Sequence, residues 1–248
     1  KSMWVAERMF DTWNEEQPQW VYPPASHLAN GPSGVTYLTG ESLPESLRGK
    51  FLLSNYRGPS ENCTVLLIGH QAKGAGYNAT SIETLIKGVG ASDVELGYDG
   101  KIYLCDFGGG WSVNENGSVQ VLGSKNAAES KAGAEVAALM EEGLAGKGYE
   151  ELIRLLDHPD RRVRQAAQFA LVEDKKKGSV ALPGVASANH SLRARLHAIW
   201  GTGQLGRRGA DVSESLMHLL KDAHPEIRAN AARVLGDLRI EKSKDLLI

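Results

Sequence analysis

The chain has 248 residues, of which 42% are hydrophobic and 23% charged, and this composition excludes a wholly disordered chain. The net charge of −2 at pH 7 argues against a dedicated nucleic-acid binder. No apolar run reaches the roughly 18 to 20 residues that cross a bilayer, so the sequence predicts no membrane span. The length favours two domains, and we expect the chain to be an interior piece of a longer protein.

The first thirty residues contain three of the five tryptophans, Trp4, Trp13 and Trp20, without clear periodicity. Such aromatic anchors are typical of a segment laid across another surface. Two interpretations are equally open: the tryptophans contact a ligand, or they pack as a wall against a sheet.

From residue 31 the sequence changes to short apolar stretches separated by Gly, Pro, Asn and Ser. Short apolar runs with close turn signals predict antiparallel strands. An Asp99-Gly100 pair between two of the runs supplies the positive φ angles of a tight hairpin. The predicted strands cover residues 34–38, 50–54, 64–68, 81–86, 93–96, 101–105 and 118–122.

Residues 93–106 read DVELGYDGKIYLCD, and this string resembles the D-V-x-x-G-x-D-G-x-x-Y-x-x-D pattern of β-propeller blades in glucose and sorbosone dehydrogenases that use pyrroloquinoline quinone. Residues 30–58 resemble the preceding blade of that family. More narrowly, the chain is similar to planctomycete-type membrane-bound dehydrogenase-like proteins, in which a propeller precedes helical repeats and often a cytochrome c domain.

The resemblance implies a secreted or periplasmic quinoprotein oxidoreductase of carbohydrate metabolism. It would oxidise a sugar or alcohol by hydride transfer to the quinone, with electrons passing to a cytochrome. Two blades do not close a propeller, which takes typically four to eight, so we expect this chain alone to be inactive. The alternative is a propeller without cofactor that, with the repeats, forms a scaffold for protein or carbohydrate binding.

No catalytic residue is identified, but four residues are candidates for contact with the quinone. Arg57 follows a strand in a loop flanked by Gly and Pro, where a guanidinium could pair with a quinone carboxylate. Its alternative role is that of a structural or solvated loop arginine. Asp93 either orients a cationic side chain or caps a turn. Propeller geometry would place Asn30 and Ser33 at the entry to a strand that faces the channel.

Metal or haem binding is not predicted. Cys63 and Cys105 do not have metal-ligand spacing, so we expect two small buried hydrophobic residues, with an opportunistic disulfide as the alternative. His27 and His70 have no partner at a metal or dyad spacing and should be ordinary surface or turn histidines. The triglycine at residues 108–110 lacks the rest of a phosphate-binding motif and fits a loop between strands.

The C-terminal half is predicted to be helical. A linker helix covers residues 134–143, and related strings begin at Val163, Leu192 and Ile227, at intervals of 29 and 35 residues. These strings resemble HEAT repeats of the phycocyanobilin-lyase-like type. The hypothesis that the protein is a lyase acting on a bilin is supported by this repeat type alone. Helical spacing predicts a core made of Leu155, Val163, Ala167, Leu171, Leu196, Ile199, Leu220, Ile227, Ala231 and Leu235.

Each related string carries an arginine: Arg164, Arg193 and Arg228. They either form a stripe for an acidic protein partner or make salt bridges between repeats. The expected fold class is therefore α+β with several domains: partial antiparallel β-propeller blades in residues 1–125, a linker helix in residues 126–147, and a HEAT-type helical solenoid in residues 148–248.

Overall fold

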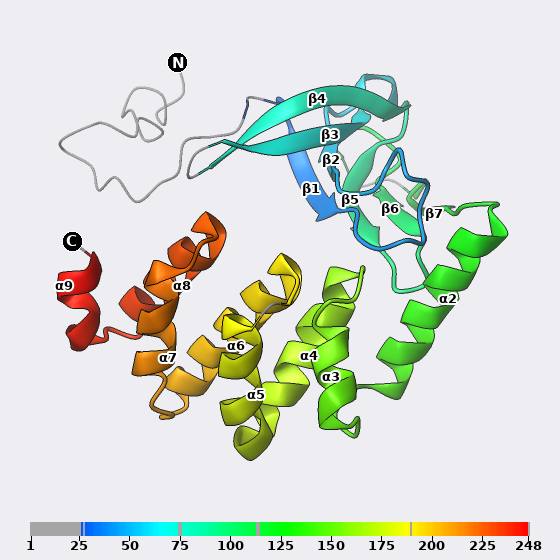
Figure 1. The fold of residues 1–248 in the computed structure, drawn as a ribbon. Coiled ribbons are helices and arrows are strands. Elements are labelled where there is room, and N and C mark those ends of the chain that lie inside the picture. Colours follow the sequence, from blue (N-terminus) through cyan, green and yellow to red (C-terminus); the bar gives the residue numbers. More distant parts are fainter. Residues whose placement is uncertain (1–25, 27, 74–75, 113–114, 189, 248) are drawn as a thin grey trace, which may run out of the picture. The chain divides into compact units, whose positions relative to one another are not determined.

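The computed structural model describes residues 26, 28–73, 76–112, 115–188 and 190–247 (Figure 1). Contacts divide the chain into two compact units, and the division follows Ser130, inside helix α2 (Ala127–Glu142). The predictions for Trp4, Trp13, Trp20 and His27 lie outside the described residues.

The first unit contains two antiparallel sheets. One has the strand order β1-β2-β3-β4, with β1 at Pro32–Tyr37, β2 at Phe51–Asn55, β3 at Thr64–Lys73 and β4 at Gly76–Lys87. The other has the order β5-β6-β7, with β5 at Ala91–Leu96, β6 at Ile102–Asp106 and β7 at Ser118–Leu122. A short 3-10 helix, η1 (Ser60–Asn62), precedes β3. Antiparallel pairing over the predicted ranges is confirmed.

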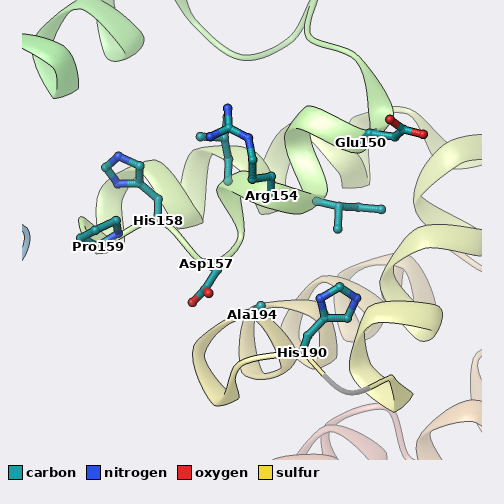
Figure 2. A pocket seen from close by; sticks show the side chains of 9 residues that line it. Glu150, Arg154, Asp157, His158, Pro159, His190 and Ala194 are labelled. Carbon is teal, nitrogen blue, oxygen red and sulfur yellow. The ribbon is translucent and has the colours of Figure 1, made fainter.

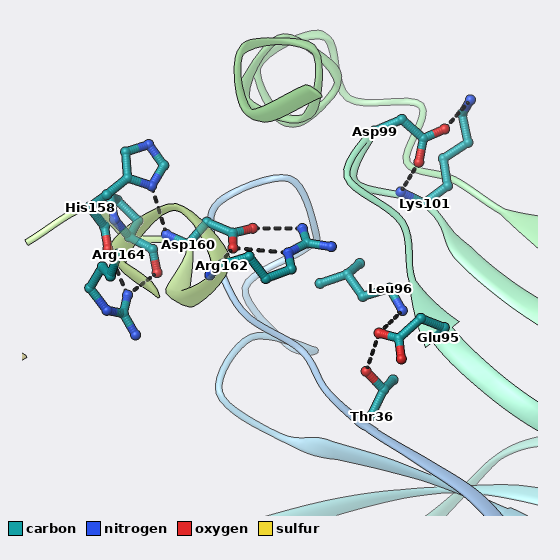
Figure 3. Close-up of polar contacts among 10 residues, drawn as sticks. Thr36, Glu95, Leu96, Asp99, Lys101, His158, Asp160, Arg162 and Arg164 are labelled. Atoms are coloured by element: carbon teal, nitrogen blue, oxygen red, sulfur yellow. Dashed lines mark hydrogen bonds and ion pairs between the residues drawn. The ribbon is translucent and has the colours of Figure 1, made fainter. Parts of the chain in front are cut away.

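The Asp-Gly hairpin between β5 and β6 has the predicted turn. Gly100 has φ of 78°, and the Gly97 N–H donates to the Lys101 carbonyl at 2.8 Å. The Asp99 carboxylate accepts the Lys101 backbone N–H at 3.1 Å and pairs with the Lys101 ammonium at 2.9 Å (Figure 3). A local sequence signal is sufficient here because every bond of the turn is made within five residues.

The prediction of propeller blades is wrong. The sheets have four and three strands, neither closes, and both contribute to a single hydrophobic core. Each blade of a propeller is a sheet that packs radially around a channel. Here β1 packs directly against β5, and the Thr36 hydroxyl on β1 donates to the Glu95 carboxylate at 2.9 Å (Figure 3). The shared core consists of Leu38, Leu43, Leu52, Val65, Leu67, Ala91, Val94, Leu96, Ile102 and Leu104.

The second unit is helical. Its α-helices after α2 are α3 (Tyr149–Leu155), α4 (Arg161–Glu173), α5 (Lys175–Ser187), α6 (Leu192–Arg207), α7 (Ser213–His218), α8 (Pro225–Asp237) and α9 (Lys244–Leu247). Short 3-10 segments lie at η2 (Leu219–Lys221) and η3 (Glu241–Ser243). Side-chain N-caps at Asp160, Asp174, Ser191 and His224 explain where α4, α5, α6 and α8 begin.

Helix α5 was not predicted from the sequence, because it contains Gly178, Pro183 and Gly184, three residues of low helix propensity. Burial against α4 and α6 stabilises it instead: Ala181, Leu182, Val185 and Ala186 all belong to the core.

The prediction of a HEAT-type solenoid is also wrong, because a solenoid stacks equivalent units. In a solenoid of helix pairs α3, α5 and α7 would be the first helices of successive repeats, but they have 7, 13 and 6 residues and are not equivalent. The predicted core residues do hold: eight of the ten are buried, and Leu196 and Leu220 are partly buried against the same cluster. No described helix is both long and apolar enough to cross a membrane.

Candidate functional site

The residues predicted for quinone contact lie around one end of the first sheet. Asn30 precedes β1 and Arg57 follows β2, and the two are linked through a backbone hydrogen bond of 2.7 Å from the Tyr56 N–H to the Gly31 carbonyl. The Arg57 N–H donates to the Cys63 sulfur at 3.2 Å. Both Asn30 and Arg57 are exposed.

Ser33 and Asp93 both lie where β1 packs on β5. The Ser33 hydroxyl contacts the Ala91 carbonyl at 3.2 Å, and a Cβ at Gly34 would come within 2.2 Å of the Asp93 carboxylate. That carboxylate accepts the Val94 N–H at 2.8 Å. The structure therefore places two of the four predicted residues along the same β1–β5 packing contact.

These four residues do not fit an anionic quinone on their own. The Ser33 hydroxyl already donates to backbone carbonyls. The Asp93 carboxylate would place a negative charge beside the negatively charged carboxylates of the quinone. Arg57 is the single cation of the set, and its guanidinium makes no hydrogen bond or ion pair with a described residue. Contact of Arg57 with a quinone stays a prediction that would need further residues.

The two cysteines differ. Cys63 is buried as predicted, but Cys105 is exposed, and both are free thiols. Cys105 lies on the solvent face of β6, where it alternates with the buried Ile102 and Leu104. Its strand position, and not its residue type, decides its exposure.

His70 lies in an aromatic cluster and not in a turn. Its ring on β3 contacts Phe51 at 5.1 Å, Tyr77 at 5.6 Å and Tyr37 at 5.8 Å between centroids. The cluster joins three neighbouring strands, β1, β2 and β3, to β4. Sequence reasoning missed it because cross-strand neighbours depend on the register.

The three arginines of the predicted stripe all make hydrogen bonds or ion pairs within the helical unit. The Arg164 guanidinium donates to the carbonyls of His158 and Pro159 at 2.6 and 2.8 Å (Figure 3). Arg228 makes the equivalent pair of bonds to the turn before α8, and Arg193 pairs with Asp157 at 3.3 Å.

In α6 the arginine equivalent to Arg164 is Arg195 and not Arg193. Ala194 and Ala198 are buried at the positions that Val163 and Ala167 hold in α4, which shifts the register by two residues. Arg195 donates to the Ala186 carbonyl at 2.8 Å and forms a bidentate pair with Asp222. The hydrogen bond from Arg195 lowers the pKa of Asp222 below its usual value.

A cavity of about 530 Å³ lies between α3 and the start of α6 (Figure 2). Two of its titratable groups are already engaged: Asp157 pairs with Arg193, and His158 Nδ1 accepts the Asp160 N–H at 3.0 Å. Within the part of the chain that the structure describes, no three His, Cys, Asp or Glu residues are grouped to hold a metal ion.

A second cavity, of about 340 Å³, is the better candidate site, and we call it the α4–α6 groove. Part of its lining is a hydrogen-bonded chain of three buried or partly buried polar side chains. His197 Nδ1 lies 2.8 Å from Gln168 Oε1, and Gln168 Nε2 donates to Gln204 Oε1 at 3.0 Å. The groove is lined by Arg161, Arg164, Gln165, Gln168 and Phe169 of α4 and by His197, Trp200 and Gln204 of α6.

The hydrogen-bond chain sets the protonation of His197. Because Gln168 donates through its amide nitrogen, its oxygen accepts, so the proton of His197 is assigned to Nδ1 and Nε2 keeps a lone pair. Burial and, secondly, the positive charge of Arg164 lower the pKa of His197 from 6.5 to about 4. His197 is 8% exposed, and its ring is neutral at pH 7.

Two aromatic side chains border the groove, and one is held rigidly. Trp200 is 40% exposed, yet its Nε1 donates to Asn230 Oδ1 at 2.9 Å and its ring packs edge-to-face on His197 at 4.9 Å. Phe169 is 44% exposed on α4. Arg164, fixed by its carbonyl bonds, and Arg161 add positive charge. The groove therefore combines a preorganised indole, apolar surface, cations and amides.

Comparisons with protein-family models, with curated proteins and with solved structures found no match for this chain.

None of the groove's side chains was singled out as functional from the sequence, apart from Arg164. A signal was present: His197 and Trp200 are three residues apart on an amphipathic helix, so they share a face. The buried Gln168 and the partly buried Gln204 lie 36 residues apart, and only the packing of α4 on α6 joins them.

The titration of His197 should link stability to pH. The unfolded chain takes up this proton near pH 6.5 and the folded chain only near pH 4. The contribution of the neutral imidazole to the free energy of unfolding is therefore complete above pH 6.5 and is lost as the pH falls toward 4. The total loss should be up to ~3 kcal/mol.

The change His197→Asn keeps an N–H donor toward Gln168 and removes the titration. We expect the variant's free energy of unfolding to fall less than the wild type's between pH 7 and pH 4.5, measured by urea denaturation. Parallel pH profiles would contradict a neutral buried imidazole.

Proposed function

We propose that this chain is a binding module whose helical unit holds a segment of a partner protein, with acidic and apolar residues, in the α4–α6 groove. One observation carries the proposal: a half-exposed Trp200, fixed by Asn230 and His197, borders a cavity that also contains two arginines. Tryptophan and arginine are the residues most enriched among those that dominate binding energy at interfaces.

The shape and chemistry of the α4–α6 groove favour a peptide segment as its ligand over a small molecule that would be deeply buried. Among the described residues, those that line the cavity come from two helices, α4 and α6, and include the amides of Gln165, Gln168 and Gln204. Amides of Gln165 and Gln204 can hydrogen-bond a peptide backbone, and the guanidinium of Arg161 can pair with a carboxylate.

Binding should depend on both the indole and the charge. The probe is a fluorescein-labelled peptide of alternating Asp and Leu residues, with a second peptide that carries Asn in place of Asp. We expect Trp200→Ala to weaken binding of the acidic peptide at least about tenfold in fluorescence polarisation, because a fixed aromatic anchor is lost. Arg161→Gln should weaken it about threefold to tenfold, and less at high salt.

Lys176→Gln is the matched control, since it removes one positive charge from an exposed position on α5 outside the groove. The proposal fails if Lys176→Gln and Arg161→Gln have equal effects, or if the Asn peptide binds as tightly as the Asp peptide.

A further inference from the structure

The two sheets of the first unit have four edge strands, and three of them are covered or protected. β1 and β5 pack against one another. β4 is irregular, because its pairing with β3 shifts register twice, and it carries the charges of Glu83 and Lys87. Bulges and charges are the usual devices that keep an edge strand from pairing with another chain.

The fourth edge, β7, has none of these devices. Its five residues, SVQVL, contain no charge and no proline, and its pairing with β6 runs without a register shift. Val119 and Val121 are 64% and 48% exposed on the outer face. Among the described residues, Ser118–Leu122 make backbone ladder bonds to β6 alone. An uncharged, regular, apolar edge is a template for an added strand.

We propose that β7 pairs antiparallel with β7 of a second copy of this chain, with the two-fold axis at Gln120. In this register Val119 lies opposite Val121 of the second copy and the reverse, so four valines gather on one face. Gln120 faces inward, where its amide donates to Asp106 at 2.8 Å, so it stays satisfied within its own chain.

The charged residues that flank β7 favour a second copy of this chain as its binding partner. Glu115 and Lys125 lie outside β7, five residues before and after Gln120, so antiparallel pairing about this axis brings the flank that carries Glu115 toward the flank that carries Lys125 of the second copy, twice by symmetry. Both side chains are exposed, and neither forms an ion pair with a described residue. The strand and its two flanks are thus self-complementary, the strand in its apolar residues and the flanks in their charges.

The contact is one strand wide, so the dimer should be weak and visible at high concentration. Sedimentation equilibrium of the full chain from about 5 to about 500 µM should show a monomer–dimer equilibrium. Val121→Lys should raise the dissociation constant at least about tenfold, because it places a charge in the valine cluster. Circular dichroism checks that this exposed substitution leaves the fold intact.

Charge reversals at Glu115 and Lys125 give the decisive test, because both residues lie outside β7 and their substitution leaves the strand sequence unchanged. Glu115→Lys and Lys125→Glu should each weaken the dimer about threefold to tenfold, and more so at low salt. The double variant should restore the wild-type constant, because it recreates opposite charges across the two-fold axis. Glu61→Lys, an exposed reversal on η1, is the control and should have no effect.

Three results would overturn the proposal: a monomer at all concentrations, a dimer insensitive to Val121→Lys, or single variants that the double variant does not rescue. An extended segment of another protein could occupy the same edge, but it would not show reciprocal rescue. These measurements do not involve the α4–α6 groove, so they stand or fall separately from the proposed binding of a peptide.

Discussion

Gly178→Ala should lower the free energy of unfolding by about 3 kcal/mol, although alanine is the better helix former. A Cβ at this position of α5 would come within 2.2 Å of the Leu171 carbonyl oxygen, which belongs to the backbone of α4 and cannot move aside like a side chain. The two helices must therefore separate, and the buried contacts between them are lost.

Gly184→Ala in the same helix is the matched control. No atom lies within 4 Å of its Cβ position, so the variant should gain about 0.5 to 1 kcal/mol from helix propensity and from a less flexible unfolded chain. Urea denaturation of both variants measures the difference. Equal stabilities would show that α4 and α5 do not approach closely at Gly178.

Asp160→Ala should cost about 2 to 4 kcal/mol, because this buried carboxylate has two functions. It caps α4 by accepting the Arg162 N–H at 2.8 Å, and it pairs with the Arg162 guanidinium at 3.0 and 2.7 Å (Figure 3). Removing it leaves a largely buried guanidinium without its carboxylate.

Asp174→Ala separates these functions. Asp174 caps α5 by accepting the Lys177 N–H at 3.1 Å, but its side chain is 40% exposed, so its loss should cost only about 1 kcal/mol. Asp160→Asn keeps a cap acceptor and should lie between the two alanine variants. A thermal or urea unfolding series that ranks Asp174→Ala as the more damaging change would contradict the double role of Asp160.

Local signals were sufficient for most of the secondary structure. Apolar runs bounded by turn residues predicted the positions of β1 to β7, and helical spacing predicted the buried residues of α4, α6 and α8. The hairpin at Asp99-Gly100 followed from two residues. Helix α5 was missed because Pro183 and the two glycines of this helix have low helix propensity, and burial in the core outweighs that propensity.

The resemblance to propeller blades and HEAT repeats did not predict how these elements pack. A strand motif such as residues 93–106 describes a hairpin, and a hairpin can enter many architectures. Whether two sheets close around a channel or share one core depends on contacts such as that of Ser33 with Ala91, which lie 58 residues apart.

The sequence by itself determined the approximate positions of the strands and of most helices, which of their faces are apolar, and that strands precede helices, because these features depend on residues within a few positions of each other. Only the tertiary structure decided which side chains meet. His197, Gln168 and Gln204 form one hydrogen-bonded chain because α4 packs on α6, and β7 is an open edge because the sheet ends there. Both proposed binding surfaces depend on such long-range contacts, and no local periodicity encodes them.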